Sequence, residues 1–248
     1  MTSLWFVTPA WQRFEMTAIC LEQRNRAIAE LARRGIEAHQ VVIADDDNLD
    51  VARGLGAAVI ECPNFDDSGT AILGRRWNLG MQYAAAEGAE WIVQIGSDSW
   101  IDPAFFLPLP DTRRTLTSTA YCAVQPGRMA QLKVSPQRIM HAAGPYVFHR
   151  SLLAPSRFAP CAETSNMTDT STVLGIQKST GRPIRWLPRT VHPFQYVGFR
   201  VEPMMTSYFA LRRRWLVHEI DDPWPVLGSH YPQDLVERAR LLMTEAAA

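Results

Sequence analysis

Lysine is nearly absent from this chain, because Lys133 and Lys178 are the only two among 248 residues and arginine supplies the rest of the positive charge. Basic and acidic side chains balance at 25 each, so the formal net charge is zero. A neutral protein has no overall field that draws it to nucleic acid or to an anionic membrane, although a local basic face can still bind a polyanion. The composition therefore disfavours a general polyanion-binding protein.

Cysteine is also scarce, and its spacing carries no motif. Cys20, Cys62, Cys122 and Cys161 are far apart, with no Cys-x-x-Cys pair. This pattern indicates buried thiols in a reducing compartment and excludes a disulfide framework or a cysteine-rich zinc site. The first residues lack the basic segment and apolar core of a signal peptide. No apolar run reaches the roughly 20 residues of a membrane-spanning helix. We therefore expect a cytoplasmic protein without a membrane span.

Short apolar runs alternate with helical patterns in the first part of the chain. Strands are predicted at residues 4–8, 39–44, 57–62 and 91–95, and helices at 15–34, 49–55 and 71–87. Such alternation with short links is typical of right-handed βαβ units around a parallel sheet. Later strands are expected at residues 115–124 and 184–187, and a last helix from about Pro232. The length suits one α/β domain spanning residues 1–248.

The stretch from Trp91 to Pro103 gives the strongest functional signal. Residues 91–95 form a short apolar run that suits a strand buried on both faces, and Gly96 closes it. Ser97 and Asp98 follow directly. In open α/β sheets, ligands bind beyond the carboxyl ends of the strands, where a carboxylate can hold a divalent cation and thereby a diphosphate. The competing interpretation is that Asp98 merely begins a turn.

Two other polar turns follow predicted strands. Thr8, Pro9 and Ala10 end the first strand, and the acidic segment Asp45–Asn48 follows the second. Because parallel strands point the same way, both turns and Ser97–Asp98 lie at one edge of the sheet. This arrangement predicts a crevice large enough for a nucleotide. The acids at 45–47 also suit the start of a helix, where the macrodipole favours negative charge.

Four segments carry a family resemblance. They are Pro9-Ala-Trp-Gln-Arg13, Ala44-Asp-Asp-Asp-Asn-Leu-Asp50, Arg75-Arg-Trp-Asn-Leu-Gly80 and Gly96-Ser-Asp-Ser-Trp-Ile-Asp-Pro103. In this order and spacing they resemble the conserved segments of family 2-type glycosyltransferases with the GT-A fold, the last being similar to the family's Asp-x-Asp motif. The resemblance implies a Rossmann-type mixed, mainly parallel sheet flanked by helices. It also implies a nucleotide-sugar half (1–110), an acceptor and catalytic half (111–203) and a C-terminal helical extension (204–248).

The resemblance assigns donor-binding roles within residues 4–103. The implied set is Thr8, Pro9, Ala10, Arg13, Asp45, Asp46, Arg76, Asn78, Ser97 and Asp98. Asp45 would bind the nucleobase or ribose, Arg76 and Asn78 would face the donor, and Asp98 would ligate Mn²⁺ or Mg²⁺ on the diphosphate. Gly96 departs from the family pattern, since it replaces the first acid of the Asp-x-Asp motif and leaves one carboxylate where two are usual. Ser99 or Asp102 would have to compensate.

The second half resembles the family less closely. Inverting members use an acid at the start of a helix as the general base, which takes the proton of the acceptor hydroxyl. Asp169 matches that position before Gly181, with Glu163 as the second candidate and a helix N-cap as the plain alternative. His192 matches a family histidine that returns to the metal, and imidazole suits Mn²⁺ better than Mg²⁺. A purely structural histidine is the competing interpretation.

The resemblance implies an inverting, metal-dependent hexosyl- or pentosyltransferase that uses a UDP-sugar. The small Arg-rich chain is also similar to bacteriophage glycosyltransferases, which modify hydroxymethylated DNA bases or virion proteins; its location would then be the host cytoplasm. A nucleotidyltransferase is the competing enzyme, although residues 9–13 lack its glycine-rich Arg/Lys loop. A catalytically degenerate module that binds nucleotide-sugars or nucleic acid is the non-enzymatic alternative, which Gly96 permits.

Overall fold

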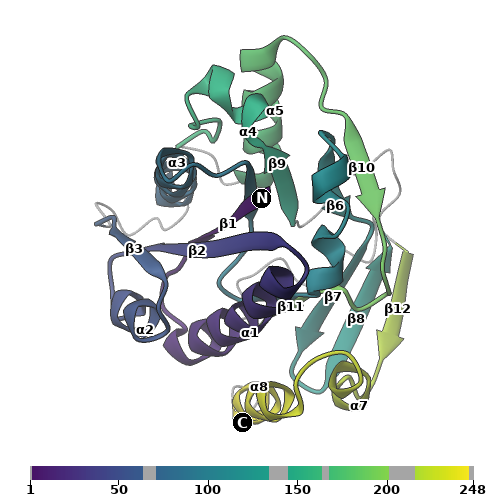
Figure 1. The fold of residues 1–248 in the computed structure, drawn as a ribbon. Helices are drawn as coiled ribbons and strands as arrows, with labels where there is room; N and C mark the ends of the chain where they lie inside the picture. The colour runs from purple at the N-terminus through teal and green to yellow at the C-terminus, as the bar shows by residue number, and fades with distance from the viewer. Residues whose placement is uncertain (1, 64–70, 134–144, 164–167, 201–215, 246–248) are drawn as a thin grey trace.

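The structure is a computed structural model that describes residues 2–63, 71–133, 145–163, 168–200 and 216–245. Two sheets and the helices around them form the molecule (Figure 1), so the predicted α/β class is confirmed. The four cysteines are free and buried, as expected. None of the helices in the described ranges combines the length and apolarity needed to cross a membrane.

The larger sheet has seven strands in the order β10-β6-β9-β4-β1-β2-β3. They are β1 (Thr2–Pro9), β2 (Ile36–Ala44), β3 (Ala58–Glu61), β4 (Trp91–Gln94), β6 (Thr115–Ser118), β9 (Tyr146–His149) and β10 (Trp186–Arg189). Neighbours pair in parallel except at β9, which runs against both β4 and β6. The predicted mixed, mainly parallel sheet is therefore confirmed.

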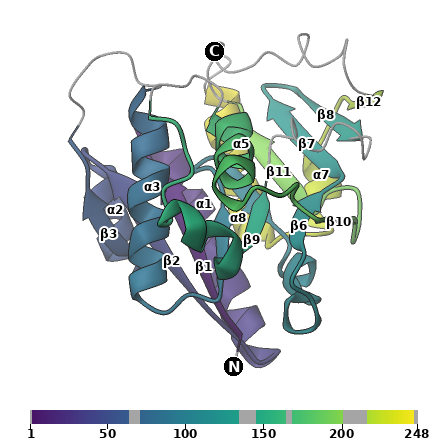
Figure 2. The same ribbon diagram turned by 90° about the horizontal axis from the view of Figure 1, so that it is seen from above.

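Helices cover both faces of this sheet. They are α1 (Phe14–Arg33), α2 (Asn48–Gly54), α3 (Ala71–Ala86), α4 (Arg150–Leu153) and α5 (Thr168–Thr180). Side chains alternate between the two faces of a strand, so Leu4 and Phe6 of β1 join the core on the side of α1, whereas Trp5 and Val7 join the core beneath α3 and α5. Seen from above (Figure 2), α3, α4 and α5 lie together over the face opposite α1.

A smaller sheet lies beside the first, in the order β12-β8-β7-β11-β5. Its strands are β5 (Ser99–Ile101), β7 (Ala120–Gln125), β8 (Arg128–Lys133), β11 (Tyr196–Phe199) and β12 (Leu216–Ile220). The C-terminal helices α7 (Trp224–Gly228) and α8 (Gln233–Glu245) cover it, and α8 packs against α1 (Figure 1). Short 3-10 helices span Pro103–Phe106 (η1), Leu109–Asp111 (η2) and Ala154–Ser156 (η4).

The prediction of a single strand at residues 115–124 is wrong. The chain forms β6 and then β7, which belong to different sheets, and the break falls at Thr119. Thr119 donates its backbone N–H to the carbonyl of Arg189, and Ser118 Oγ bonds to the backbone of Ala120. Side-chain capping of the backbone competes with regular pairing, and here it ends one strand before the next begins. The strand predicted at 184–187 lies two residues later, at β10.

Candidate active site

A pocket opens at the carboxyl edge of the larger sheet, beyond β1 and β4. It brings together part of the predicted donor-binding set: Pro9, Ala10, Arg13, Arg76, Ser97 and Asp98. Trp11, Leu73, Trp77 and Gly96 complete its lining. Because β1 and β4 pair in parallel, their ends meet at one edge, which is why residues far apart in the sequence share this pocket.

Asp98, which lines this pocket, forms ion pairs with two arginines. Its Oδ2 lies 3.3 Å from Nη1 of Arg13 and 2.5 Å from Nη1 of Arg200. Its Oδ1 accepts a hydrogen bond from the hydroxyl of Ser99 at 3.1 Å. The side chain of Asp98 is only 8% exposed, so the carboxylate is largely removed from water and these partners replace its hydration. Charge-assisted hydrogen bonds of this kind fix the groups more firmly than neutral ones.

Arg200 is a site residue that sequence reasoning missed. It directly follows β11, and β11 pairs with β5, which directly follows Asp98. The backbone N–H of Phe199 donates to the carbonyl of Asp98 at 2.8 Å, and that of Arg200 to the carbonyl of Val124 at 2.8 Å. The signal in the sequence is an arginine at the end of a short apolar run. It became informative only once the pairing of β5 with β11 was known.

Gly96 belongs to the same arrangement. A Cβ atom at this position would lie 2.6 Å from Oδ1 of Asp98 and 3.3 Å from the hydroxyl of Ser99. Any side chain at position 96 therefore requires the Asp98 carboxylate to move. The absence of an acid at position 96, where the Asp-x-Asp motif has its first Asp, therefore permits the present orientation of Asp98.

Beneath the pocket, the buried guanidinium of Arg24 ties α1 to the sheet edge. It donates to the hydroxyl of Thr8 at 2.6 Å, to the carbonyl of Gly96 at 3.1 Å and to the carbonyl of Ser99 at 3.4 Å. Burial lowers the pKa of Arg24 to about 10, so the group stays charged at neutral pH. Thr8 is itself buried and directly precedes Pro9, which lines the pocket. Arg24 was missed, although its place on the apolar face of the predicted helix was a usable signal.

Asp45 and Arg76 form a second ion pair beside the pocket. Oδ1 of Asp45 lies 2.6 Å from Nη2 of Arg76, whose Nη1 donates to the carbonyl of Ala10 at 2.7 Å. The Arg76 side chain is 2% exposed, against 14% for Asp45. Arg76 therefore fixes the turn after β1 from below, and Asp45 offers the more accessible face of the pair.

Asp46 supports the turn that carries Arg13. Its carboxylate accepts from the backbone N–H of Gln12 at 2.8 Å and from the side chain of Asn48 at 2.7 Å. Gln12 and Arg13 both have φ of +54°, a left-handed conformation that non-glycine residues adopt rarely. The Asp46 carboxylate, two residues before α2, and the Asn48 amide, which donates to the Gln12 carbonyl at 3.0 Å, thus hold an unfavourable turn. This turn sets Trp11 and Arg13 at the pocket.

Asn78 points away from the pocket lining and binds the segment that precedes α5. Its amide nitrogen donates to the carbonyl of Cys161 at 3.0 Å, and its amide oxygen accepts from the Cys161 N–H at 2.9 Å. Gly74 and Gly175 allow the backbone to pass closely here. A Cβ on Gly74 would lie 2.3 Å from the carbonyl oxygen of Ala162, and a Cβ on Gly175 would lie 1.9 Å from that of Pro160. The segment is therefore wedged between α3 and α5.

Asp169 lies in the first turn of α5, and its side chain is outside the described part of the structure. About one turn later, the hydroxyl of Thr172 accepts a hydrogen bond from the amide of Gln94 at 3.3 Å. Gln94 is the last residue of β4, so the first turns of α5 approach the edge where the pocket opens. Glu163, the second candidate base, is exposed just before α5.

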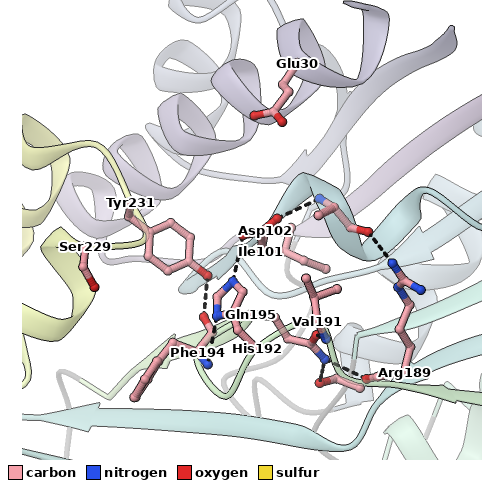
Figure 3. Close-up of polar contacts among 12 residues, drawn as sticks. Glu30, Ile101, Asp102, Arg189, Val191, His192, Phe194, Gln195, Ser229 and Tyr231 are labelled. Carbon is pink, nitrogen blue, oxygen red and sulfur yellow. Dashed lines mark hydrogen bonds and ion pairs between the residues drawn. The ribbon is translucent and has the colours of Figure 1, made fainter. Parts of the chain in front are cut away.

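The structure does not bring His192 to Asp98. Nε2 of His192 lies 2.8 Å from Oδ2 of Asp102 (Figure 3). The ring of His192 stacks on His230, with centroids 4.1 Å apart. The N–H of Phe194 donates to Nδ1 of His192 at 3.2 Å. Asp98 and Asp102 flank β5 at opposite ends, and the four residue steps between them span about 13 Å. Within the described residues, no three His, Cys, Asp or Glu side chains are grouped so that they would hold a metal ion.

Comparison with known proteins gives structural matches only. The sequence matches no known family model and no curated protein. The structure is similar to a fragment of S. aureus TarS, with a TM-score of 0.55 and 15% identity over 80% of this chain and 60% of that one. A longer TarS structure gives a TM-score of 0.53 at 14% identity, covering 81% of this chain and 37% of that one.

A third match is a variant of Drosophila β1,4-galactosyltransferase 7 in complex with manganese, UDP-Gal and xylobiose. Its TM-score is 0.50 at 11% identity, over 79% of this chain and 69% of that one. Compared with the two TarS structures, this chain spans less than two thirds of their length. At such identities the likeness establishes a shared fold.

Proposed function

Because this chain has the GT-A fold of nucleotide-diphospho-sugar transferases, we propose that it is a glycosyltransferase. It moves a hexosyl or pentosyl group from a nucleotide-diphosphate sugar to an acceptor hydroxyl. The observation that carries the proposal is the pocket at the carboxyl edge, where Arg13 after β1 and Asp98 after β4 meet Arg76 of α3. Ligands of open α/β sheets bind at this edge.

A UDP-sugar is the proposed donor. The similar galactosyltransferase structure holds UDP-Gal, which supports uridine as the base. Asp45, the more exposed partner of the buried Arg76, would contact the base or ribose. The turn at Thr8, Pro9 and Ala10, and Ser97 opposite it, would line the nucleoside and phosphate path.

The departing diphosphate gains negative charge as the sugar leaves, so the site must neutralise it. Mn²⁺ or Mg²⁺ at Asp98 and His192 is one proposed means, and the similar galactosyltransferase structure contains manganese. The described side chains do not fit that set, since both arginines occupy Asp98 Oδ2 and His192 bonds to Asp102. Side chains, and not a metal ion, are therefore left to neutralise the diphosphate.

Asp169 is the proposed general base, with inversion at the anomeric carbon. The acceptor hydroxyl gives its proton to the Asp169 carboxylate as its oxygen forms the new bond to the sugar. On the opposite face, the bond from the anomeric carbon to the diphosphate oxygen breaks, and its electron pair leaves with the diphosphate. The contact between Thr172 and Gln94 supports this role, because it sets the start of α5 against the end of β4.

The proposed acceptor is a hydroxyl group of a phage macromolecule. A hydroxymethylated base of phage DNA or a hydroxyl of a virion protein follows from the sequence resemblance alone. The neutral chain argues against an extended duplex surface. A base flipped into the site would require only a local basic groove.

The test is release of nucleoside diphosphate from a panel of nucleotide-sugars, with water or an added hydroxyl compound as acceptor. Asp169→Asn should slow release by roughly 10²- to 10⁴-fold while donor binding persists. Asp47→Asn, a change in an exposed acid at the start of α2, is the matched control and should leave the rate unchanged. Binding without turnover would indicate a binding module, and pyrophosphate release from nucleoside triphosphates would indicate a nucleotidyltransferase.

A further inference from the structure

We infer that this site neutralises the donor diphosphate with the guanidinium groups of Arg13 and Arg200, which Asp98 holds in place, and that it needs no divalent cation. This inference rests on the proposed function and concerns the same pocket. It starts from the three charged groups, which carry a formal charge of +1 together. A dianionic ligand phosphate would complement this charge.

Both arginines are preorganised around Asp98, and Arg13 lines the pocket beside it. Nη2 of Arg200 donates to the hydroxyl of Tyr121 at 2.5 Å, and the guanidinium lies over the Tyr121 ring, 5.7 Å from its centroid. Arg13 is set by the left-handed turn that Asp46 supports. The side chains of Arg13 and Arg200 are only 16% and 17% exposed. Donors fixed before the reaction stabilise developing charge without reorganising during it.

Asp98 acts here as the positioning counter-ion of the arginines. A guanidinium carries five N–H donors in a planar fork. One arginine can therefore bind Asp98 and a phosphate oxygen at the same time. The Ser99 hydroxyl, which accepts from Tyr196 at 3.2 Å and donates to Asp98, fixes the other carboxylate oxygen.

A divalent cation is incompatible with this geometry. Bound at Oδ2 of Asp98, it would stand beside two guanidinium groups, and like charges repel strongly where water is largely excluded. A second carboxylate at position 96 would offset that repulsion. A side chain there would instead meet Oδ1 of Asp98, with its Cβ at 2.6 Å. Gly96 thus removes one of the two acids that would bind a metal ion. It also permits the orientation in which the remaining acid, Asp98, pairs with the two arginines.

The experiment compares the affinity for a nucleoside diphosphate with that for its nucleoside, by calorimetry on chelator-treated protein with and without Mn²⁺. UDP and uridine are the first pair, followed by the GDP, ADP, CDP and dTDP pairs. We expect the ratio of affinities to be the same with EDTA as with Mn²⁺. Arg13→Ala and Arg200→Ala should each lower the ratio by about tenfold to a hundredfold, as expected for loss of a charged hydrogen bond, and leave nucleoside binding unchanged.

Two variants sharpen the test. Arg200→Lys keeps the charge without the fork and should recover part of the ratio. Arg33→Ala removes an exposed arginine at the other end of α1 and should change nothing. Diphosphate binding that requires Mn²⁺ would overturn the inference and leave the glycosyltransferase proposal standing. If no nucleoside diphosphate or nucleotide-sugar binds with or without metal, both fail.

Discussion

Arg24 reaches from the buried face of α1 to the hydroxyl of Thr8, over 2.6 Å, and so links the first helix to the end of the first strand. The same guanidinium holds the carbonyls of Gly96 and Ser99. The chain next to the lining residue Pro9 and the backbone of the lining residue Gly96 therefore share one buried cation.

Replacing Arg24 with methionine should lower the free energy of unfolding by about 2–4 kcal/mol, because a hydroxyl and two carbonyls lose their charged donor inside the protein. Urea denaturation measures the change. Arg33→Met, at the exposed end of the same helix, should stay within about 0.5 kcal/mol of the wild type. Equal stability of the two variants would show that the buried contacts contribute nothing net.

Gly96→Ala should weaken nucleoside diphosphate binding by about tenfold or more, since the new Cβ would displace the Asp98 carboxylate and with it Arg13 and Arg200. Calorimetry measures the loss. Gly54→Ala is the matched control, because a Cβ at that position in α2 meets nothing within 4 Å. Unchanged affinity in Gly96→Ala would mean that the orientation of Asp98 is irrelevant to the ligand.

Asn78→Ala should reduce the turnover rate more than it changes KM for the donor. The side chain contacts the backbone of Cys161 and so positions the segment before α5, which carries the proposed base. Loss of the two hydrogen bonds should also lower stability by about 1–3 kcal/mol. Steady-state kinetics against Gln82→Ala, an exposed position of the same helix, provide the comparison. A pure rise in KM would instead indicate direct donor contact.

His230 should titrate below pH 6.5, because burial and the neighbouring His192 lower the pKa of its imidazole. The folded state then binds fewer protons than the unfolded state as the pH falls below 6.5, so this group removes stability at acidic pH and restores it as the pH rises. NMR titration of the ring protons measures the pKa. His230→Phe keeps an aromatic ring on His192 and should flatten that part of the stability profile. A pKa above 6.5 would contradict the prediction.

Strands β1, β2 and β4 and the turns after them could be predicted from the sequence, because apolar runs and helical periodicity are local signals. The meeting of Pro9, Ala10, Ser97 and Asp98 followed from the rule that parallel strands end at one edge, whereas Arg13 and Arg76 were expected there only from the family resemblance. Arg200 could not be found this way. It joins Asp98 across 102 positions of sequence through the pairing of β11 with β5, and no local pattern encodes such a pairing.

The contact of His192 with Asp102 could not be predicted from the sequence for the same reason. Asp102 meets it because η1 and the turn before β11 come together at the far end of β5, a long-range event. Likewise residues 115–124 have uniform strand character. The division of this run between two sheets depends on neighbours elsewhere in the chain, such as Arg189.

The packing of α8 against α1 has a consequence for synthesis of the chain. Met16 and Ile19 of α1 share one apolar cluster with Leu235 and Ala239 of α8. A ribosome makes α1 before α8, so Met16 and Ile19 lack their α8 partners until residues 233–245 have been translated. The order of translation thus delays this cluster, whereas Leu31 and Leu21 of α1 can already pack against the early strands.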